Sequence, residues 1–565
     1  MSKPIYVLGT GLSHNGSAVL LKDGIIRVAI EKERITRIKH DGGNDSDAIQ
    51  YCLDAEGITL DDITVVVQCE NFTLPKRGSF NGKRVFSDSN QPKIIDISHH
   101  LAHAYSAVGT SPFSDCNVMV IDGCGSPLQQ FIELHPEQKG KIDGSISQIS
   151  EMQCEKDSFY YFDGQTLVPL IKDFSSMSEH SSEKFQLPTT QHSIGGFYAS
   201  ISKYVFGDMD DVGKLMGLAP YGKSGIYPFD AFELQLGRLM VKDDWKQHFT
   251  KPSSGYEYFK EHFDYYANVA KWAQEQVEKA IIQCIKNRVE QFPHENLCYS
   301  GGVALNAVAN AKLEDLKLAK NIYIEPAAAD NGLALGCAFY GWLEFLKMPK
   351  IEHDGSTCFG KNYGKEEVSE ALVSSEEYSK TEFENEDELL TYCAKKLNHG
   401  KTIGWFQSGS EFGPRSLGRR SILAHPGIIG MKDHINRNIK FREDFRPFAP
   451  AVLQEKVKDY FEVGRNSPYM ILVDRTKKEF LEKLRNVTHQ DGSARVQTIE
   501  RSWNPKFYRL VEAFDQESGI AVVLNTSLNR KGMPIVETPA QALQLFRETA
   551  LDIMVIEDTV LEKRV

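Results

Sequence analysis

The sequence of 565 residues lacks several features that would narrow its class at once. No run of about eighteen apolar residues occurs, so we expect no transmembrane helix and no membrane partner. The start has neither the basic residues nor the long apolar stretch of a signal peptide. Basic residues are not in excess, because 65 Lys and Arg stand against 77 Asp and Glu, a formal net charge of −12. That balance disfavours nucleic acid, whose phosphates attract basic surfaces.

The ten cysteines form no CxxC pair. Several lie in apolar surroundings, for example Cys284. This usage is typical of reduced, buried thiols in a cytoplasmic protein, and it disfavours a disulfide framework or a zinc–thiolate site. The chain is also too long for a single hydrophobic core, so at least two large domains are expected.

The first part of the chain predicts a three-strand meander. Apolar runs at 5–9, 17–21 and 25–30 are typical of strands, and Asp23-Gly24 is a strong hairpin-turn signal. A similar start, an apolar strand leading into a glycine loop, recurs at 117–125. Two such starts predict a duplicated α/β domain, the plan of the actin and hexokinase class.

Domain boundaries follow from changes in composition. Residues 266–292 have the periodicity of a helix. Residues 136–190 are polar and irregular, and we interpret them as an embellishment with hairpins. Residues 351–384 are charged and weakly periodic, so we predict a linker there, between a first domain at 1–350 and a second at 385–565.

Two histidines four residues apart are the clearest candidate metal ligands. On a helix, His99 and His103 would share one face. Asp330 offers a third ligand, and a 2-His-1-carboxylate set leaves open positions suited to iron or to Lewis-acid chemistry. The alternative is an ordinary helix start with one buried and two solvated histidines.

Small-residue loops in the first domain could lie close to a nucleotide. A glycine turn lets backbone N–H groups approach an anion without side-chain clash. Such loops contain Asp122, Gly123 and Gly125, Lys214 and Gly217, and Gly301 and Gly302. Each also has a plain interpretation as a tight turn or a helix start.

The second domain gathers basic residues in loops with glycine and proline. Arginine suits bidentate recognition of phosphate, so several arginines in an acidic protein indicate an anionic ligand. The alternative is a set of surface ion pairs with Glu411, Glu443 and Asp444. The basic candidates are Arg415, Lys440, Arg442, Arg446 and Arg495.

Together these motifs resemble the O-carbamoyltransferases of natural-product biosynthesis, such as the tobramycin, novobiocin, cephamycin, geldanamycin and Nod-factor enzymes. The matching runs follow one another over nearly the whole chain. They are SHNGSA at 13, ERITRIKH at 33, HHLAH at 99, DGCG at 122, KLMGLAPYG at 214, SGGVALN at 300, EPAAADNG at 325, EFGPRSLGRRS at 411, KFREDFRPFAP at 440, DGSARVQT at 491 and NTSLN at 525.

The resemblance implies an actin-like first domain, similar to the tRNA threonylcarbamoyl-transferring subunit, and a YrdC-like α/β second domain. In the family, the second domain makes carbamoyl-adenylate from carbamoyl phosphate and ATP, with Mg²⁺. The first domain then transfers the carbamoyl group to a hydroxyl of a small natural-product acceptor. A divalent metal, iron in the family, is expected on His99, His103 and Asp330.

The resemblance also assigns roles to single residues. Arg415, Lys440, Arg446 and Arg495 would bind the phosphates, and His14 would take the proton of the acceptor alcohol. Arg442, Asn525 and Ser527 are expected to be further nucleotide or phosphate contacts. The nucleotide cleft of the first domain would be lined by Lys39, Asp122, Gly195, Lys214, Gly217, Gly302 and Asn306.

The sequence departs from the family at three places, and rival functions remain. Asn15 stands where an aspartate is usual, Leu528 replaces phenylalanine, and Lys531 replaces arginine. A threonylcarbamoyl-type tRNA-modifying enzyme is the nearest alternative, and the net charge disfavours it. A sugar kinase would need neither the histidine pair nor the arginines, and a silent nucleotide-binding regulator would have lost site residues. The sequence does not identify the acceptor, although residues 136–190 are expected to form part of its pocket. A homodimer is possible, but the sequence does not decide the oligomeric state.

Overall fold

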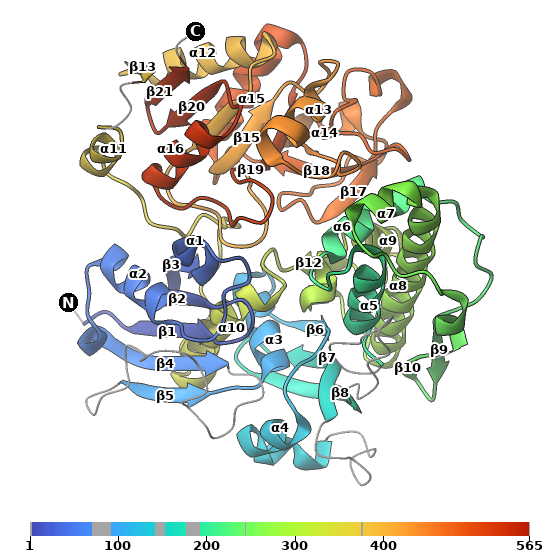
Figure 1. Cartoon of the computed structure of the whole chain (residues 1–565). Helices are drawn as coiled ribbons and strands as arrows, with labels where there is room; N and C mark the ends of the chain where they lie inside the picture. Colours follow the sequence, from blue (N-terminus) through green and yellow to red (C-terminus); the bar gives the residue numbers. More distant parts are fainter. Residues whose placement is uncertain are drawn as a thin grey trace. The chain divides into compact units, whose positions relative to one another are not determined.

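The computed structural model describes residues 3–69, 92–141, 153–176, 192–242, 244–373 and 377–563 (Figure 1). The chain divides into two compact units. Unit 1 comprises Met1–Arg27 and Gly42–His353, and unit 2 comprises Val28–Asp41 and Asp354–Val565. The chain therefore passes from one unit to the other three times. Within the described ranges, each helix is too short or too polar to cross a lipid bilayer.

The first sheet of unit 1 has the strand order β3-β2-β1-β4-β5. β1 is antiparallel to β2 and parallel to β4, which is parallel to β5. Asp23 and Gly24 have φ of 51° and 82°, as a tight hairpin turn requires. The predicted meander is confirmed. The strands are β1 (Tyr6–Gly11), β2 (Ser17–Lys22), β3 (Ile25–Glu31), β4 (Ile63–Cys69) and β5 (Lys93–Asp96).

The second sheet of unit 1 repeats this connectivity, with the order β12-β11-β6-β7-β8. β6 is antiparallel to β7 and parallel to β11, which is parallel to β12. The duplicated α/β plan is therefore confirmed. The strands are β6 (Cys116–Ile121), β7 (Gln153–Phe162), β8 (Leu167–Ser176), β11 (Asn296–Ser300) and β12 (Asn321–Ile324).

The interpretation of 136–190 as an embellishment was wrong for two of its segments. β7 and β8 are integral strands of the second sheet, and β7 is almost wholly buried. The aromatic run within β7, residues 159–162, is part of the hydrophobic core and not a peripheral addition to it. Residues 142–152 and 177–190 of that range, and with them part of the predicted acceptor pocket, lie outside the described residues.

Two helices lie between the two sheets of unit 1 (Figure 1). α10 packs on β1, β2 and β4, whereas α3 packs on β6, β7 and β11. Their backbones touch, because a Cβ added to Gly336 would lie 1.7 Å from the carbonyl oxygen of Ala102. Every residue of α3 is buried, so the helix that carries the histidine pair is held on all sides. 

The remaining elements of unit 1 surround these two layers, and the predicted helix at 266–292 is confirmed as α8. The helices are α2 (Ser46–Glu56), α3 (His99–Thr110), α4 (Leu128–Leu134), α5 (Ile194–Phe206), α6 (Val212–Leu218), α7 (Tyr256–Glu261), α8 (Phe263–Gln291), α9 (Ala307–Leu316) and α10 (Leu333–Tyr340), with the hairpin β9 (Phe232–Gln235) and β10 (Arg238–Val241).

Unit 2 is an α/β domain built on a nine-stranded mixed sheet of order β13-β21-β20-β14-β15-β19-β16-β18-β17. One hydrophobic core packs helices α12, α15 and α16 against the sheet. The strands are β13 (Tyr378–Glu382), β14 (Ile403–Phe406), β15 (Arg420–Ala424), β16 (Ala449–Leu453), β17 (Leu472–Arg475), β18 (Ser493–Ile499), β19 (Val522–Ser527), β20 (Ile553–Ile556) and β21 (Thr559–Lys563).

The helices of unit 2 include one from the beginning of the chain. α1 belongs to the segment Val28–Asp41, and α11 and β13 lie within 351–384. The helices are α1 (Lys32–Thr36), α11 (Lys365–Ala371), α12 (Glu386–Asn398), α13 (Met431–Ile435), α14 (Val457–Tyr460), α15 (Pro505–Ser518) and α16 (Pro539–Glu548).

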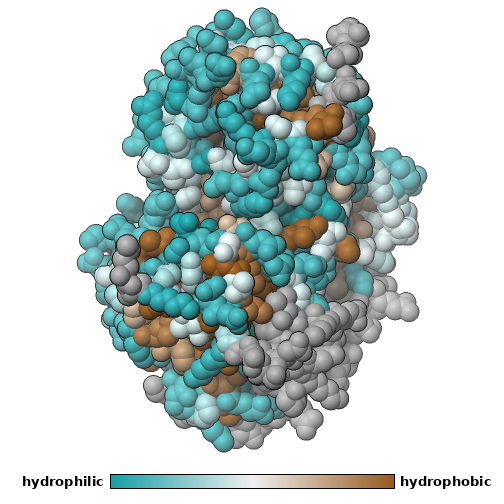
Figure 2. Space-filling view, turned by 90° about the vertical axis from the view of Figure 1, so that its left-hand side faces the viewer, coloured by the Kyte–Doolittle hydropathy of each residue, from teal (hydrophilic) through white to brown (hydrophobic). Residues whose placement is uncertain are grey.

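Hydrophilic residues cover most of the described surface on the face drawn in Figure 2, with hydrophobic residues in scattered groups. The exposed large hydrophobic residues come from separate elements. They include Ile25, Ile38, Leu236, Val373 and Ile429. Scattered in this way, exposed hydrophobic side chains need no special explanation.

Candidate functional site

α3 places its two histidines in its first two turns, beginning at the first residue. The backbone N–H of His99 donates to Ser126 Oγ at 2.9 Å, and that of His100 donates to Glu155 Oε2 at 3.2 Å. These bonds satisfy amides that have no partner within the helix. His99 and His103 are both fully buried, one helical turn apart. 

Two carboxylates meet the histidines. Asp122 directly follows β6, and Asp330 lies in the loop after β12. His99 Nε2 is 3.0 Å from Asp122 Oδ2, 3.1 Å from His103 Nε2 and 3.6 Å from Asp330 Oδ1. The four ligand atoms lie within 4.8 Å of one another. We call this set the four-donor group; it contains the predicted triad, and Asp122 joins as a donor that sequence reasoning had placed at a nucleotide.

The four-donor group fits a divalent metal. Two imidazole nitrogens that face each other at 3.1 Å, with two carboxylates beside them, are a donor set that transition metals prefer. Burial disfavours charge on His99, but Asp330 and Asp122 outweigh it and raise the pKa of His99 well above its usual value. Burial likewise opposes charge on Asp122 and Asp330, and the histidines nevertheless lower both pKa values.

His100 is not one of the donors. Its Nδ1 lies 2.6 Å from Ser158 Oγ on β7. Burial, helped by the nearby Lys172, lowers the pKa of His100 to about 3, so its ring is neutral at physiological pH. The alternative of one buried and two solvated histidines is therefore wrong, because all three rings are buried.

His14 lies beside the four-donor group. Its Nδ1 is 3.9 Å from Asp330 Oδ2, and its Nε2 is 3.8 Å from Asp210 Oδ1. The carboxylate of Asp330 is the main cause that raises the pKa of His14, because it stabilises the protonated ring. Asn15 cannot supply a carboxylate, but Asp330 and Asp210 approach His14 from elsewhere in the chain. Sequence reasoning missed Asp210, for which no spacing gave a signal.

The glycines of the DGCG loop permit close packing around Asp122. A Cβ on Gly125 would lie 2.6 Å from Glu155 Oε2 and from a ring carbon of His100. A Cβ on Gly195, at the start of α5, would lie 2.8 Å from the backbone nitrogen of Gly123. These contacts account for the glycines by packing alone, so their role at a nucleotide stays a prediction.

The glycine turn after β11 completes this region. Gly301 has a φ of 91°, and a Cβ there would lie 2.3 Å from the carbonyl oxygen of Ile121. Gly302 donates its N–H to Asp122 Oδ1 at 3.1 Å. Asn306 caps α9 by accepting from the Ala309 N–H at 3.1 Å. 

The other predicted nucleotide residues of the first domain lie in two places. Lys214 and Gly217 are on α6, where Lys214 forms an ion pair with Asp211. Lys39 belongs to unit 2 and is exposed.

Unit 2 brings the predicted basic residues together. We call Arg415, Lys440, Arg442, Arg446 and Arg495 the cation cluster. Burial and mutual repulsion lower the pKa of Lys440, Arg442 and Arg495 well below their usual values. Burial and the nearby Arg446 lower the pKa of Arg415 to about 10. Cations at such close quarters stabilise an anion placed among them.

Some members of the cluster are held by protein oxygens. Lys440 Nζ donates to Ser527 O at 2.7 Å, and Arg442 Nε donates to Asn436 Oδ1 at 2.7 Å. Arg446 lies 3.8 Å from Glu443. By contrast, the buried Nε atoms of Arg415 and Arg495 have no hydrogen-bond partner among the described residues.

The surface ion pairs considered as an alternative do not explain the cluster. Asp444 pairs with Arg437, outside the cluster, at 2.9 Å. Glu411 is fully buried and accepts backbone N–H groups instead. Glu443 is the one of the three that reaches the cluster, and it also binds Lys531 at 2.7 Å. 

Asn525 and Ser527 lie on β19, and their side chains form hydrogen bonds with neighbouring loops and strands. Asn525 Nδ2 donates to Ser416 O at 3.1 Å and to Gln497 Oε1 at 2.8 Å. The Ser527 hydroxyl donates to Asn529 Oδ1 at 2.7 Å. These bonds fix the segment after Arg415 against β18 and β19.

Two family models match the chain. The one described as Carbamoyltransferase N-terminus matches residues 7–85 and 81–339, and the one described as Carbamoyltransferase C-terminus matches 394–563. The chain belongs to the carbamoyltransferase family. The predicted family resemblance is thus confirmed, and this carbamoyltransferase is an enzyme of carbamoyl-group transfer.

Relatives of this carbamoyltransferase span most of its length. An uncharacterized protein of Synechocystis sp. is 30% identical, covering 99% of this chain and 97% of the relative. Nodulation protein NolNO of Sinorhizobium fredii is 30% identical, over 98% and 79%. The 3'-hydroxymethylcephem-O-carbamoyltransferase of Amycolatopsis lactamdurans is 28% identical, over 83% and 80%. The solved structure of T. kodakarensis HypF covers 61% of this chain and 49% of its own at 13% identity, with a TM-score of 0.40, which is too low to support a conclusion.

Proposed function

We propose that this carbamoyltransferase is an ATP-dependent O-carbamoyltransferase that works in two stages. In the first stage, unit 2 makes carbamoyl-adenylate from carbamoyl phosphate and ATP. In the second, unit 1 transfers the carbamoyl group to a hydroxyl of a small molecule. The observation that carries the proposal is the cation cluster, in which the Nε atoms of Arg415 and Arg495 are buried and have no hydrogen-bond partner among the described residues.

The first stage joins two highly charged molecules. Water hydrolyses carbamoyl phosphate to carbamate and inorganic phosphate, and a carbamate oxygen then attacks the α-phosphorus of Mg²⁺-ATP. The bond from that phosphorus to the bridging oxygen breaks, pyrophosphate leaves, and carbamoyl-adenylate remains. Arg415 and Arg495 offer donors to the phosphates, and Arg446 and Lys440 offset their charge.

In the second stage, the acceptor hydroxyl attacks the carbamoyl carbon and AMP leaves. His14 lies beside the four-donor group and is half exposed, so it can reach an acceptor and take the hydroxyl proton. A divalent metal held by His99, His103, Asp122 and Asp330, iron by analogy with the family, would supply a Lewis acid there. His99, His103 and Asp122 are buried, which limits the access of water to the reacting group.

The first stage is tested by incubating the protein with Mg²⁺-ATP and labelled carbamoyl phosphate. We expect pyrophosphate release that depends on carbamoyl phosphate and needs no acceptor. Arg495→Met should lower this release by about 100-fold or more, because it removes a charged phosphate contact. Arg501→Met, which alters an exposed ion pair with Glu512, is the matched control and should retain it. Wild-type protein that leaves ATP intact in this assay would end the proposal.

The second stage is tested with pre-formed carbamoyl-adenylate and a panel of alcohols. Sugars, aminoglycosides and hydroxymethyl compounds cover the main classes of small acceptor. Arg495→Met should retain transfer, whereas His14→Ala should lose most of it. Full transfer by His14→Ala would remove that residue from the scheme. 

A further inference from the structure

A short helix from the beginning of the chain is built into unit 2. In α1 and the residue before it, Arg34 and Glu31 are buried, with exposures of 1% and 5%. Arg34 Nε pairs with Glu31 Oε2 at 2.9 Å. A buried ion pair of this kind is stable only when its remaining donors and acceptors are also satisfied.

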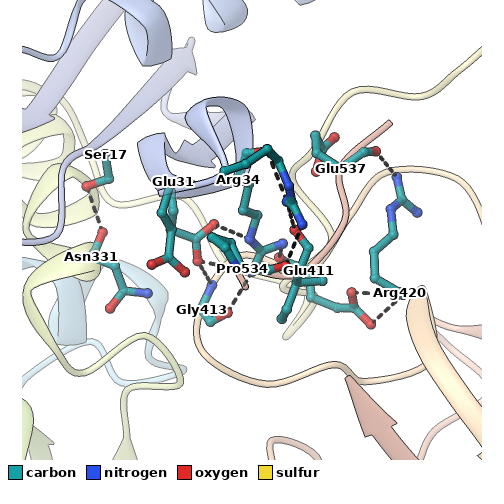
Figure 3. A network of polar contacts seen from close by, with 12 residues as sticks. Ser17, Glu31, Arg34, Asn331, Glu411, Gly413, Arg420, Pro534 and Glu537 are labelled. Atoms are coloured by element: carbon teal, nitrogen blue, oxygen red, sulfur yellow. Dashed lines mark hydrogen bonds and ion pairs between the residues drawn. The ribbon is translucent and has the colours of Figure 1, made fainter. Parts of the chain in front are cut away.

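The partners of this pair lie in the loop that carries Arg415 (Figure 3). Arg34 donates to the carbonyl oxygens of Glu411 at 2.5 Å and Gly413 at 2.7 Å. The carboxylate of Glu31 accepts the N–H of Gly413 at 2.6 Å. Three hydrogen bonds therefore hold the loop two to four residues before Arg415.

The other side of the same loop is held by its own carboxylate. Glu411 Oε1 accepts the N–H groups of Leu417 and Arg419, each at 2.6 Å. Gly413 has a φ of 112°, a conformation that residues with a side chain rarely adopt. Arg415 thus lies on a short stretch fixed at both ends, with the Arg34–Glu31 pair as the anchor on one side.

The residue that follows α1, Arg37, reaches a second loop of unit 2. Arg37 donates to the carbonyl oxygens of Pro534 and Ile535, both at 2.7 Å. This loop follows β19, and in it Lys531 binds Glu443 beside the cation cluster. α1 and Arg37 together therefore contact both loops that border the cluster.

We propose that Arg34 is a positioning residue for the first stage of the reaction. It holds the 411–420 loop so that the guanidinium of Arg415 faces the phosphate group of the bound substrate. Arg34 itself touches no substrate; it acts through the backbone of the loop. The inference rests on the proposed function, since it takes Arg415 as a phosphate ligand.

The forked guanidinium is what the role requires. One arginine bonds two carbonyl oxygens and one carboxylate in a fixed plane, whereas a lysine ammonium is a point charge on a flexible stem. Arg34→Lys keeps the charge beside Glu31 but cannot reproduce this geometry. A displacement of about 1 Å at a reacting group can cost about 100-fold in rate.

The first experiment measures binding of inorganic phosphate to the full-length protein by calorimetry. We expect Arg34→Lys to weaken binding about tenfold or more in protein that is still folded at the temperature of the assay. Arg501→Lys is the matched control and should bind as the wild type does. Unchanged affinity in Arg34→Lys, or a wild type that binds no phosphate, would overturn the proposal.

A double-mutant cycle separates positioning from a general loss of structure. In an Arg415→Met background, Arg34→Lys should change phosphate affinity less than about twofold, because its effect passes through Arg415. Equal losses in both backgrounds would contradict it. If Arg34→Lys does not fold, Glu31→Gln replaces it in the cycle, since it weakens the Gly413 contact and retains the arginine.

Pyrophosphate release separates this inference from the function on which it rests. If the wild type is active, Arg34→Lys should raise the KM for carbamoyl phosphate in pyrophosphate release. It should leave the rate of transfer from pre-formed carbamoyl-adenylate unchanged. An equal loss in both reactions would contradict a role confined to the 411–420 loop. A wild type that binds phosphate but releases no pyrophosphate would refute the proposed function, while the phosphate affinities would still decide the role of Arg34.

Discussion

Four side chains from three separate segments of the chain lie close together in unit 1. Asp122 and Asp330 follow β6 and β12, which belong to the same sheet, and His99 and His103 come from the helix packed on it. Because parallel strands of one sheet end at the same edge, their following residues converge. The carboxylates are therefore positioned by the sheet and the histidines by α3.

Asp122→Asn should weaken binding of a divalent ion such as Co²⁺ about tenfold or more, because it replaces an anionic donor with a neutral one. Asp115→Asn is the control, since Asp115 precedes the same strand at its other end. Titration followed by the visible spectrum of the bound Co²⁺ measures both. Equal affinities in the two variants would exclude Asp122 from the donor set.

Glu325, at the end of β12, is a buried carboxyl group that the proposed reaction does not use. It is 2% exposed, and its Oε2 has no hydrogen-bond partner among the described residues. Burial raises the pKa of Glu325 to about 8, although the Ala327 N–H opposes the shift. The folded protein therefore holds a proton there at neutral pH that the unfolded chain has released.

This proton makes stability fall as pH rises. A carboxyl group with a raised folded-state pKa contributes stability that is complete below its unfolded pKa and is lost up to the folded value, here about 8. The loss is roughly 1.4 kcal/mol per pH unit across that window. Glu325→Gln should lose less stability than the wild type between pH 5.5 and 8.5. Thermal midpoints of both proteins at the two pH values test it, and a constant difference between them would contradict it.

The sequence could identify donors but not all their partners. His99 and His103 are recognisable from a spacing of four, because helix geometry is local. Asp122 as a donor depends on the register between β6 and the helix packed on it, which no local pattern encodes. Asp210 approaches His14 only through the fold of unit 1.

At the scale of elements, the N-terminal end of α3 is held by a carboxylate from strand β7. Glu155 on β7 accepts the N–H groups of His100 and Ser126, at 3.2 Å and 2.9 Å, and forms a buried ion pair with Lys172 on β8. The pair lowers the pKa of Glu155 to about 2 against the effect of burial. A negative charge at this point also favours the N-terminal end of the helix dipole.

Glu155→Gln should destabilise unit 1 by about 3–5 kcal/mol, because it leaves Lys172 buried without its counter-charge. The double variant Glu155→Gln/Lys172→Met should be less destabilised than the single one, since it removes the uncompensated cation. Denaturant unfolding measures the stabilities, and Co²⁺ titration reports the order of the α3 start. Equal destabilisation of both variants would contradict the ion-pair explanation.

Element prediction succeeded where patterns were regular and failed where they were not. The first three strands and α8 follow from short apolar runs, a DG turn and a long apolar stripe. β7 and β8 were missed as core strands because charged residues such as Lys156, Asp157 and Lys172 are buried in them. Buried ion pairs replace the apolar residues that the pattern method counts, here Lys156 with Asp173 at 3.0 Å.

At the scale of the whole molecule, unit 2 is discontinuous in sequence. Its Val28–Asp41 segment is separated from the rest by more than three hundred residues of unit 1. Sequence reasoning places domain boundaries where composition changes along the chain, so it predicts contiguous domains. The bonds of Arg34 and Arg37 to distant loops show where this segment belongs.

A fragment of residues 354–565 should be incomplete for this reason. We expect its 411–420 loop to be cut faster by proteases than in the full-length protein, because the Arg34 and Glu31 bonds are missing. Fusing residues 28–41 to the fragment through a flexible linker should restore protection. The same fusion carrying Arg34→Gln should not. Cleavage sites identified by mass spectrometry decide the matter, and a fragment already as resistant as the full chain would contradict the expectation.

The triple passage of the chain between the units constrains how such enzymes can be recombined. A hybrid that joins the first 353 residues of one homologue to the remainder of another would combine α1 from the first with the loops of unit 2 from the second. Functional hybrids should therefore exchange the Val28–Asp41 segment together with the C-terminal portion. Substitutions in that segment and in the loops that it contacts are then expected to be inherited together.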